Sequence, residues 1–359
     1  MRSIDHFLSY FVLGPSFSTN FQSLVEIGLS EYRELVREGC LACAGAVFHA
    51  RSKKSGFDNI NFERSAVGLR KLRRGNVTKR DTGAFLALGL TLATFDLITS
   101  GTSAHMITRF TLSLINLSHP SIWMDPCMQS EPLCLIFMDT VECLLRRQIP
   151  VIRYRVRDPY LVDRLIGLCS PLLPIMYDVC WLAYESRSRS SLLQQLSPNL
   201  FDDLNELVAS WRPRPSPDLL SKFSSQEVTC MLTQARVLRM AVSLVLHRLK
   251  YPFGVEDRMA TRLSTDILSE CAICSSIVGE ADKLPQTLFP WMMAAIEVTS
   301  PEKRLMLLGM ELPKSREILS VPTAKMKESI RFVWDIRDAG YATSLFDILE
   351  QAPIYVVPL

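Results

Sequence analysis

The sequence lacks the residue patterns of the common enzyme classes. It has only 15 glycines and five histidines in 359 residues, and it contains no glycine-rich phosphate loop, no Gly-x-Ser-x-Gly segment and no His-Glu-x-x-His segment. The adjacent carboxylates Asp202 and Asp203 lie in a segment that we expect to form an exposed helix, without the further carboxylate of a terpene-cyclase-like metal site. We therefore predict no catalytic residue and no enzymatic activity.

Signals for strands, secretion and membrane spans are also scarce. The one alternating run, VIRYRV at 151–156, is isolated, and we expect it to be an extended connector between helices. The most apolar segment, 84–98, is shorter than the roughly 20 residues of a membrane span and contains Asp96, so we expect a buried helix and no membrane contact. Because no secretion signal is visible, we expect an intracellular protein with reduced cysteines.

What the sequence does contain is helical periodicity along most of its length. We predict an all-α fold, a large irregular multi-helix bundle or superhelix, with residues 1–359 as a single domain. The clearest amphipathic helix is 225–250, with Ser224 or Ser225 as its N-cap and Glu227 in its first turn. Further helices are expected at about 255–278 and 322–339.

Prolines and short polar runs mark the interruptions. The segment 211–217, WRPRPSP, is the strongest breaker and is expected to be a loop or linker, and 51–62 is expected to be a second loop. In the apolar stretch 159–186, Pro171 and Pro174 should kink or split the helix.

Two Cys-x-x-Cys pairs have the spacing of zinc ligands. Cys40 and Cys43 form the first pair, and Cys271 and Cys274 form the second. Neither has a second pair at a suitable distance, and at i and i+3 of a helix both cysteines share one apolar stripe. We interpret both pairs as core packing and predict no metal and no cofactor.

Basic residues gather in two places, although the net charge is only +3. In the first cluster the segment around Arg70, Lys71, Arg73 and Arg74 is the candidate nuclear-import patch. The full set is Arg64, Arg70, Lys71, Arg73, Arg74, Lys79 and Arg80, and the second cluster comprises Arg146, Arg147, Arg153, Arg155 and Arg157. For direct DNA contact we favour the alternative that both are solvated helix ends, because the overall charge is modest.

The order of segments resembles the fungal-specific transcription factor domain, the helical regulatory half of fungal zinc-cluster transcription factors. The segment 21–50 resembles its first helix pair ending in His49, RSAVGLRKLRRG resembles its next helix, and 85–115 resembles the following pair with Asp96 and His105. The most specific match is FPWMMAAIEVTSPEKRLMLL, an aromatic-Pro helix and then a Ser-Pro-Glu-x-Arg helix start. VWDIRDAG at 333–340 resembles the closing helix.

The resemblance implies a transcription regulator in the nucleus. The family carries a Cys-rich zinc-cluster module before the helical domain, and the ten cysteines here do not form its six-cysteine pattern. We therefore expect action through a protein partner, either a full-length transcription factor or a second copy of this chain, with direct DNA contact doubtful. By analogy with the family, a secondary-metabolite gene cluster is the expected target.

Two alternatives remain open from the sequence. The chain could be a helical module that binds a lipid or sterol-like effector, with Met292, Met293 and 306–310 lining an apolar pocket. Ordinary core packing is the competing interpretation of these methionines. The other alternative is an uncharacterised helical enzyme.

Overall fold

The computed structural model describes residues 13–17, 30–52, 59–118, 130–187, 200–278, 287–310, 319–340 and 343–352. Within these residues the chain forms fourteen α-helices and no β-strand, with one isolated bridge between Asp163 and Gly167. The all-α prediction is confirmed.

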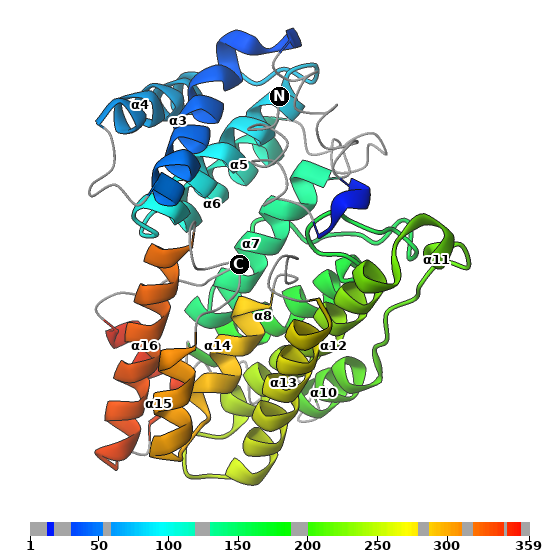
Figure 1. The fold of residues 1–359 in the computed structure, drawn as a ribbon, viewed down its shortest axis with the longest axis vertical. Coiled ribbons are helices and arrows are strands. Elements are labelled where there is room, and N and C mark those ends of the chain that lie inside the picture. Colours follow the sequence, from blue (N-terminus) through cyan, green and yellow to red (C-terminus); the bar gives the residue numbers. More distant parts are fainter. Residues whose placement is uncertain are drawn as a thin grey trace.

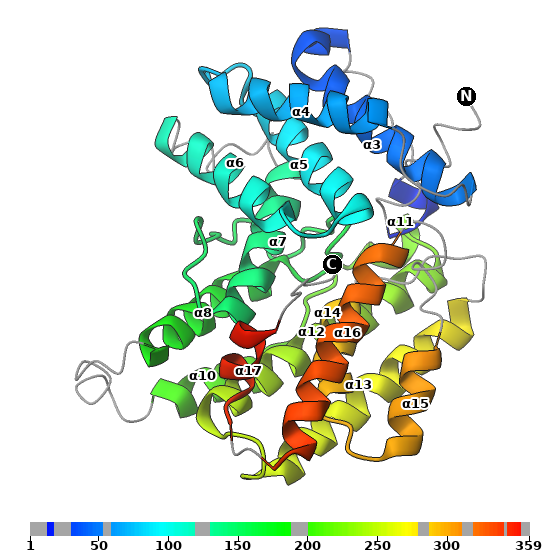
Figure 2. The same cartoon turned by 90° about the vertical axis from the view of Figure 1, so that its left-hand side faces the viewer.

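The N-terminal helices form a layer at one end of the molecule (Figures 1 and 2). They are α3 (Arg33–Ser52), α4 (Asn59–Arg74), α5 (Thr82–Thr99) and α6 (Ala104–Ser118). Helix α5 packs against each of the other three, so apolar side chains on nearly all of its faces are covered. This is the buried helix that the sequence predicts at 84–98.

The loop expected at 51–62 is wrong at both ends, because residues 51–52 close α3 (Arg33–Ser52) and residues 59–62 are already helical. Helix α4 already begins at Asn59, and residues 53–58 lie outside the described part. Asn61 is buried in the first turn, beside Gly45 of α3, where a Cβ atom would collide with the Asn61 amide. Close packing of the two helices therefore starts α4 in a segment whose local sequence favours a loop.

Helix α7 (Ser130–Arg146) leads from this layer into the larger body of the molecule (Figure 2). The segment 151–156 follows as an extended connector, as predicted. The prolines split the next stretch: a 3-10 turn, η4 (Ser170–Leu172), comes first, and α8 (Leu173–Arg187) follows with Pro174 in its first turn, where no intrahelical N–H is needed.

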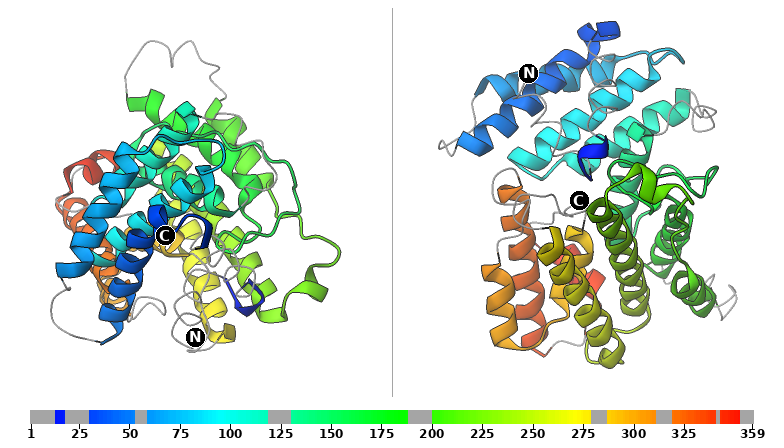
Figure 3. Two further views of the ribbon diagram at one scale, coloured as in Figure 1. Left: turned by 90° about the horizontal axis from the view of Figure 1, so that it is seen from above. Right: turned by 45° about the vertical axis from the view of Figure 1, so that its right-hand side comes forward.

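The second half of the chain surrounds a long helix, α12 (Ser225–Lys250). Helices α8, α10, α13 and α14 pack against it, and Figure 3 shows this larger body from two further sides. Around α12 lie α10 (Leu200–Ser210), α11 (Leu219–Lys222), α13 (Asp257–Val278), α14 (Leu288–Ile296), α15 (Pro301–Gly309), α16 (Ser320–Asp338) and α17 (Leu345–Gln351). Residues 211–217 form the loop between α10 and α11, as predicted.

Local capping signals set the start of α12. The Ser224 hydroxyl accepts a hydrogen bond from the Glu227 backbone N–H, and the Glu227 carboxylate accepts one from the Ser224 N–H at 2.9 Å. This reciprocal capping box confirms Ser224 as the N-cap. At the other end Tyr251 leaves the helix in an extended conformation before Pro252.

One large hydrophobic cluster draws on residues from Val36 to Leu349, so both ends of the molecule contribute to it. Two helices, α5 and α12, are long and apolar enough to cross a membrane by length and composition. Of their most apolar windows 56% and 72% is buried inside the protein, and core helices pass the same test, so they are weak evidence for a span.

Candidate functional site

The predicted import patch lies on the last turn of α4. Arg70, Arg73 and Arg74 are exposed, and none of them forms an ion pair with a described residue. Lys71 differs: it is half-buried, and its Nζ donates to the backbone carbonyl of Glu34 in α3. Three of the four cations are therefore available to a partner, and the fourth holds α4 against α3.

Three of the five arginines in the second basic cluster form ion pairs with carboxylates of the same chain. Arg147 donates to Asp347 at 2.7 Å and to Glu350 at 2.9 Å, both in α17, and Arg153 pairs with Asp178 of α8 at 2.9 Å. These pairs join α7 and the extended connector to later helices.

Arg146 pairs with Glu142 one turn earlier, at 2.7 Å, whereas Arg155 is exposed. Arg146, Arg147 and Arg153 are each paired with a carboxylate. The structure therefore favours a role for this cluster in holding helices together over contact with phosphates.

The two Cys-x-x-Cys pairs lie on helices with their second cysteine in the interior. Cys43 is 1% exposed in α3, and Cys274 is 1% exposed in α13. Burial raises the pKa of the Cys40 thiol to about 11 and that of Cys271 to about 12, so these two are poor nucleophiles. Cys43 packs in a buried apolar cluster, as expected. The Cys274 Sγ contacts the Cys230 Sγ of α12 rather than Cys271, the other cysteine of its Cys-x-x-Cys pair.

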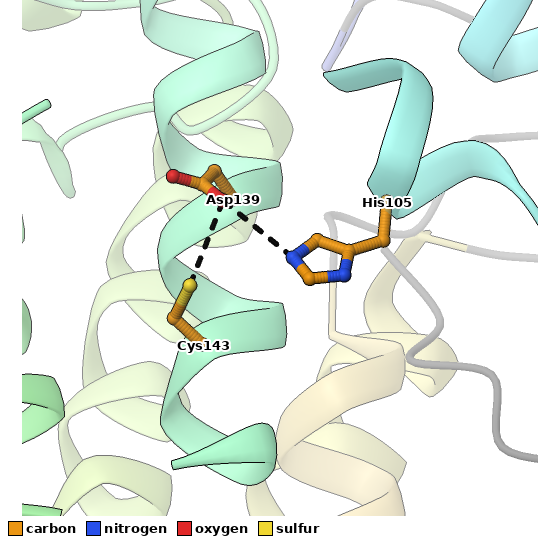
Figure 4. A group of neighbouring side chains, drawn as sticks. All are labelled: His105, Asp139 and Cys143. Atoms are coloured by element: carbon orange, nitrogen blue, oxygen red, sulfur yellow. Dashed lines mark hydrogen bonds and ion pairs between the residues drawn. The ribbon is translucent and has the colours of Figure 1, made fainter. Parts of the chain in front are cut away.

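A polar cluster joins α6 to α7 in the apolar interior, and the sequence analysis missed its α7 members. His105 comes from the first turn of α6, and Asp139 and Cys143 lie one turn apart on α7 (Figure 4). The His105 Nε2 lies 3.6 Å from Asp139 Oδ1, and the Cys143 Sγ lies 3.5 Å from the same oxygen. One donor atom from each of the three lies within 4.8 Å of the others.

Arg109 determines what this cluster can do. Its Nη1 donates to Asp139 Oδ1 at 3.1 Å, to Cys143 Sγ at 2.9 Å and to the Ile149 carbonyl at 3.2 Å. The other Asp139 oxygen accepts the Val151 N–H at 2.7 Å.

The buried Asp139 carboxylate thus already has a cationic partner, and a metal ion would have to displace the guanidinium from the same two donor atoms. Burial, together with Asp139, raises the pKa of the Cys143 thiol, which opposes the thiolate form that binds metals. The cluster is best explained as the polar contact that fixes α6, α7 and the turn at 149–151 to one another.

A second buried network lies where α12, α14 and α16 meet. The Arg248 side chain is 0% exposed and donates to both Glu297 oxygens, at 2.7 Å from Nε and 2.5 Å from Nη2. It also donates to Asp257 at 2.8 Å. Burial alone would lower the pKa of Arg248, but its bonds to Glu297 and Asp257 outweigh that effect and raise it.

The ring of Phe253 lies between two guanidinium groups of this network. The Arg248 Cζ is 4.6 Å from the ring centroid, and the Arg337 Cζ is 4.2 Å from it. Arg337 also donates to the Ile296 carbonyl at 2.5 Å. The network therefore binds the end of α14 to α12 and α16.

Glu297 belongs to the segment that carries the most specific sequence match, and the rest of that segment has structural roles too. Ser300 caps α15 and Pro301 is at its first helical position, as predicted. Arg304 forms an ion pair with Asp338 at 2.5 Å and stacks on Trp334, with 5.0 Å between its Cζ and the ring centroid. These residues hold helices together.

The structure also locates the paired carboxylates and the methionines that the sequence singles out. Asp202 and Asp203 are exposed on α10, and Asp202 pairs with Lys250, as expected for a solvated face. Met292 and Met293 are core residues at 1% and 0% exposure. Met306 is 61% exposed, so the suggestion that 306–310 lines an interior pocket is wrong at that position.

The profile of the fungal specific transcription factor domain matches residues 5–352, nearly the whole chain. No curated protein and no solved structure matches.

Proposed function

The chain belongs to the family of fungal specific transcription factor domains, and on that premise we propose that it regulates transcription through a partner factor. The match over residues 5–352 carries the proposal, since it assigns nearly the whole chain to a regulatory domain of a family that is typically non-enzymatic. The nucleus is the proposed location, as a transcription factor domain implies.

The distribution of charge supports a partner rather than direct contact with DNA. Domains that bind phosphate backbones carry a strong excess of positive charge that extends along a face or stripe. Here Arg147 and Arg153 are matched by carboxylates, and the net charge of the chain is +3. The exposed group on α4, Arg70, Arg73 and Arg74, remains, and its compact form on one helix end suits recognition by an import receptor.

The first experiment is the transcript profile of a strain that lacks the gene. We expect a compact set of co-located genes to fall silent, as for a secondary-metabolite cluster, and a plasmid copy of the gene to restore them. Unchanged transcripts in cells that express the protein would contradict a regulatory role.

A second experiment separates partner-dependent from direct action. The tagged protein should occupy the affected promoters in cells, while the purified chain alone should bind DNA of those promoters no better than unrelated DNA of equal length. Deleting the gene of a co-purifying zinc-cluster factor should remove the occupancy. Sequence-specific binding by the purified chain would show that it contacts DNA itself.

A further inference from the structure

The contact between Cys230 and Cys274 joins two helices through sulfur atoms. Cys230 lies in the second turn of α12 and Cys274 in the final turns of α13, and their Sγ atoms are 3.9 Å apart. The two side chains, 2% and 1% exposed, form a small apolar cluster of their own outside the main core. The cluster consists of these two cysteines, and 44 residues separate them in the sequence.

The position of Cys274 gives small oxidants a route to the pair. Helix α13 is a surface helix, with Ile273 56% exposed and Ile277 47% exposed on either side of Cys274. Its last residue is Val278, and the final carbonyls of a helix lack intrahelical partners, so terminal turns open far more easily than the whole protein unfolds. Cys274 lies four residues before Val278, within reach of such local opening.

The two thiols are also unequal in reactivity. Hydrogen bonds with Cys230 and Thr233 outweigh the effect of burial and lower the pKa of Cys274 to about 7. Other buried thiols, such as Cys43 and Cys169, have raised pKa values because burial disfavours the thiolate. A thiol with a lowered pKa, in contact with a second thiol, has the arrangement of a reactive and a resolving cysteine.

We propose that Cys230 and Cys274 form a reversible disulfide between α12 and α13, with hydrogen peroxide as the class of oxidant. The Cys274 thiolate attacks one peroxide oxygen, the O–O bond breaks, and the departing hydroxide takes up a proton to leave as water. The Cys230 thiol then attacks the resulting sulfenic sulfur, and the S–O bond breaks as the Cys230 proton leaves with the hydroxide as a second water. The two sulfurs are oxidised, the peroxide is reduced, and a thiol such as glutathione reverses the step.

The full purified chain tests the proposal without any substitution. Reduced protein is treated with hydrogen peroxide, unfolded in denaturant, alkylated there with N-ethylmaleimide and digested without reductant, and the peptides are analysed by mass spectrometry. We expect one cross-linked peptide pair containing Cys230 and Cys274, about 2 Da lighter than the two reduced peptides together. Both thiols should be protected from alkylation, and dithiothreitol should restore them.

Matched variants identify the role of each cysteine. In Cys230→Ser, a dimedone adduct should accumulate on Cys274 after peroxide treatment, and in Cys274→Ser no such adduct should form on Cys230. Cys271→Ser, three residues away on the same helix, should keep the cross-link. The thermal unfolding midpoint of each variant is compared with that of the parent to confirm folding.

Several results would overturn the assignment. One is full alkylation of Cys230 and Cys274 in the parent after peroxide treatment. The others are a cross-link through Cys271 and a cross-link that joins two chains.

Discussion

A buried ion pair ties α12 to the end of α14. The Arg248 guanidinium and the Glu297 carboxylate are 0% and 1% exposed and are bound to each other through two hydrogen bonds. Desolvating two ions costs several kcal/mol each, and their mutual contact is the main interaction that offsets that cost. Removing one partner is therefore far more damaging than the modest net value of the pair suggests.

We expect Glu297→Gln to lower the free energy of unfolding by about 3 kcal/mol, because Arg248 would keep its charge in the interior without its main counter-ion. Urea unfolding at neutral pH measures the change without the screening that guanidinium chloride introduces. Glu270→Gln is the matched control. Its partner Arg236 lies on α12, as Arg248 does, but the side chains of this pair are 50% and 27% exposed. The control should cost at most about 1 kcal/mol, and equal losses in the two variants would show that Glu297 is not buried with its partner.

Sequence reasoning at the residue scale found Glu297 within a motif and overlooked Asp139. A carboxylate inside the apolar run PLCLIFMDTVECLL must have a buried partner, and that requirement is a signal that the sequence does contain. The identity of the partner is not in the sequence. Arg109 is 30 residues earlier in the chain, and only the packing of α6 on α7 brings it within 3.1 Å.

At the scale of elements, the start of α12 anchors a distant segment. The Glu227 carboxylate that completes the capping box also accepts hydrogen bonds from the Ser16 N–H at 2.9 Å and the Ser16 hydroxyl at 2.7 Å. Phe17 stacks on Phe223 with ring centroids 4.9 Å apart. One carboxylate thus caps the longest helix and holds residues 13–17 against it.

This double role predicts a pH dependence. Burial would raise the pKa of Glu227, but the hydrogen bonds from Ser16 and Ser224 outweigh it, so the folded-state pKa lies below the ordinary value. A carboxylate with a depressed folded pKa contributes stability above its unfolded pKa of about 4.3, and this contribution is lost as the pH falls through the folded pKa.

We expect Glu227→Gln to lower the free energy of unfolding by about 1 to 2 kcal/mol at pH 7. The difference from the parent should shrink as the pH falls below about 4, because protonation removes the same charge from the parent. Urea unfolding of both proteins across this range gives the comparison. Glu302→Gln, at the exposed cap of α15, is the control and should show a smaller effect; a pH-independent difference for Glu227→Gln would contradict the assignment.

Elements with local signals were predicted well. Ser224 and Ser300 mark helix starts because capping involves residues within one turn, and the prolines at 171 and 174 break the helix because they lack an N–H. The start of α4 was missed because contact between Gly45 and Asn61, on different helices, overrides the loop-forming residues that precede it.

At the scale of the whole molecule, exposed cations that form no ion pair within the chain are available to contact other molecules. Arg70, Arg73 and Arg74 are exposed near the C-terminal end of α4. This helix belongs to the N-terminal layer (Figure 1). Lys71 is left out of this group because its Nζ donates to the Glu34 carbonyl. Replacing Lys71 would therefore also remove a contact between α4 and α3.

We expect the triple variant Arg70→Ala, Arg73→Ala and Arg74→Ala to keep the parent's thermal midpoint, since exposed cations contribute little to stability. Its nuclear fluorescence as a fusion to a fluorescent protein should fall several-fold. Three scattered exposed arginines, Arg155, Arg214 and Arg258, replaced by alanine provide a control with the same change of charge. Unchanged localisation of the α4 variant would remove the import role.

The sequence by itself determined the fold class, the helix ends with local caps, the segments that must be buried and the family resemblance, because these depend on periodicity and on contacts within a turn. Only the tertiary structure decided which basic residues are matched by carboxylates, that Arg109 occupies the centre of the His105 cluster, and that Cys274 meets Cys230 instead of Cys271. The physical reason is that ion pairs and sulfur contacts act over a few ångströms. Helix packing brings together residues that are 30 to 200 positions apart in the chain.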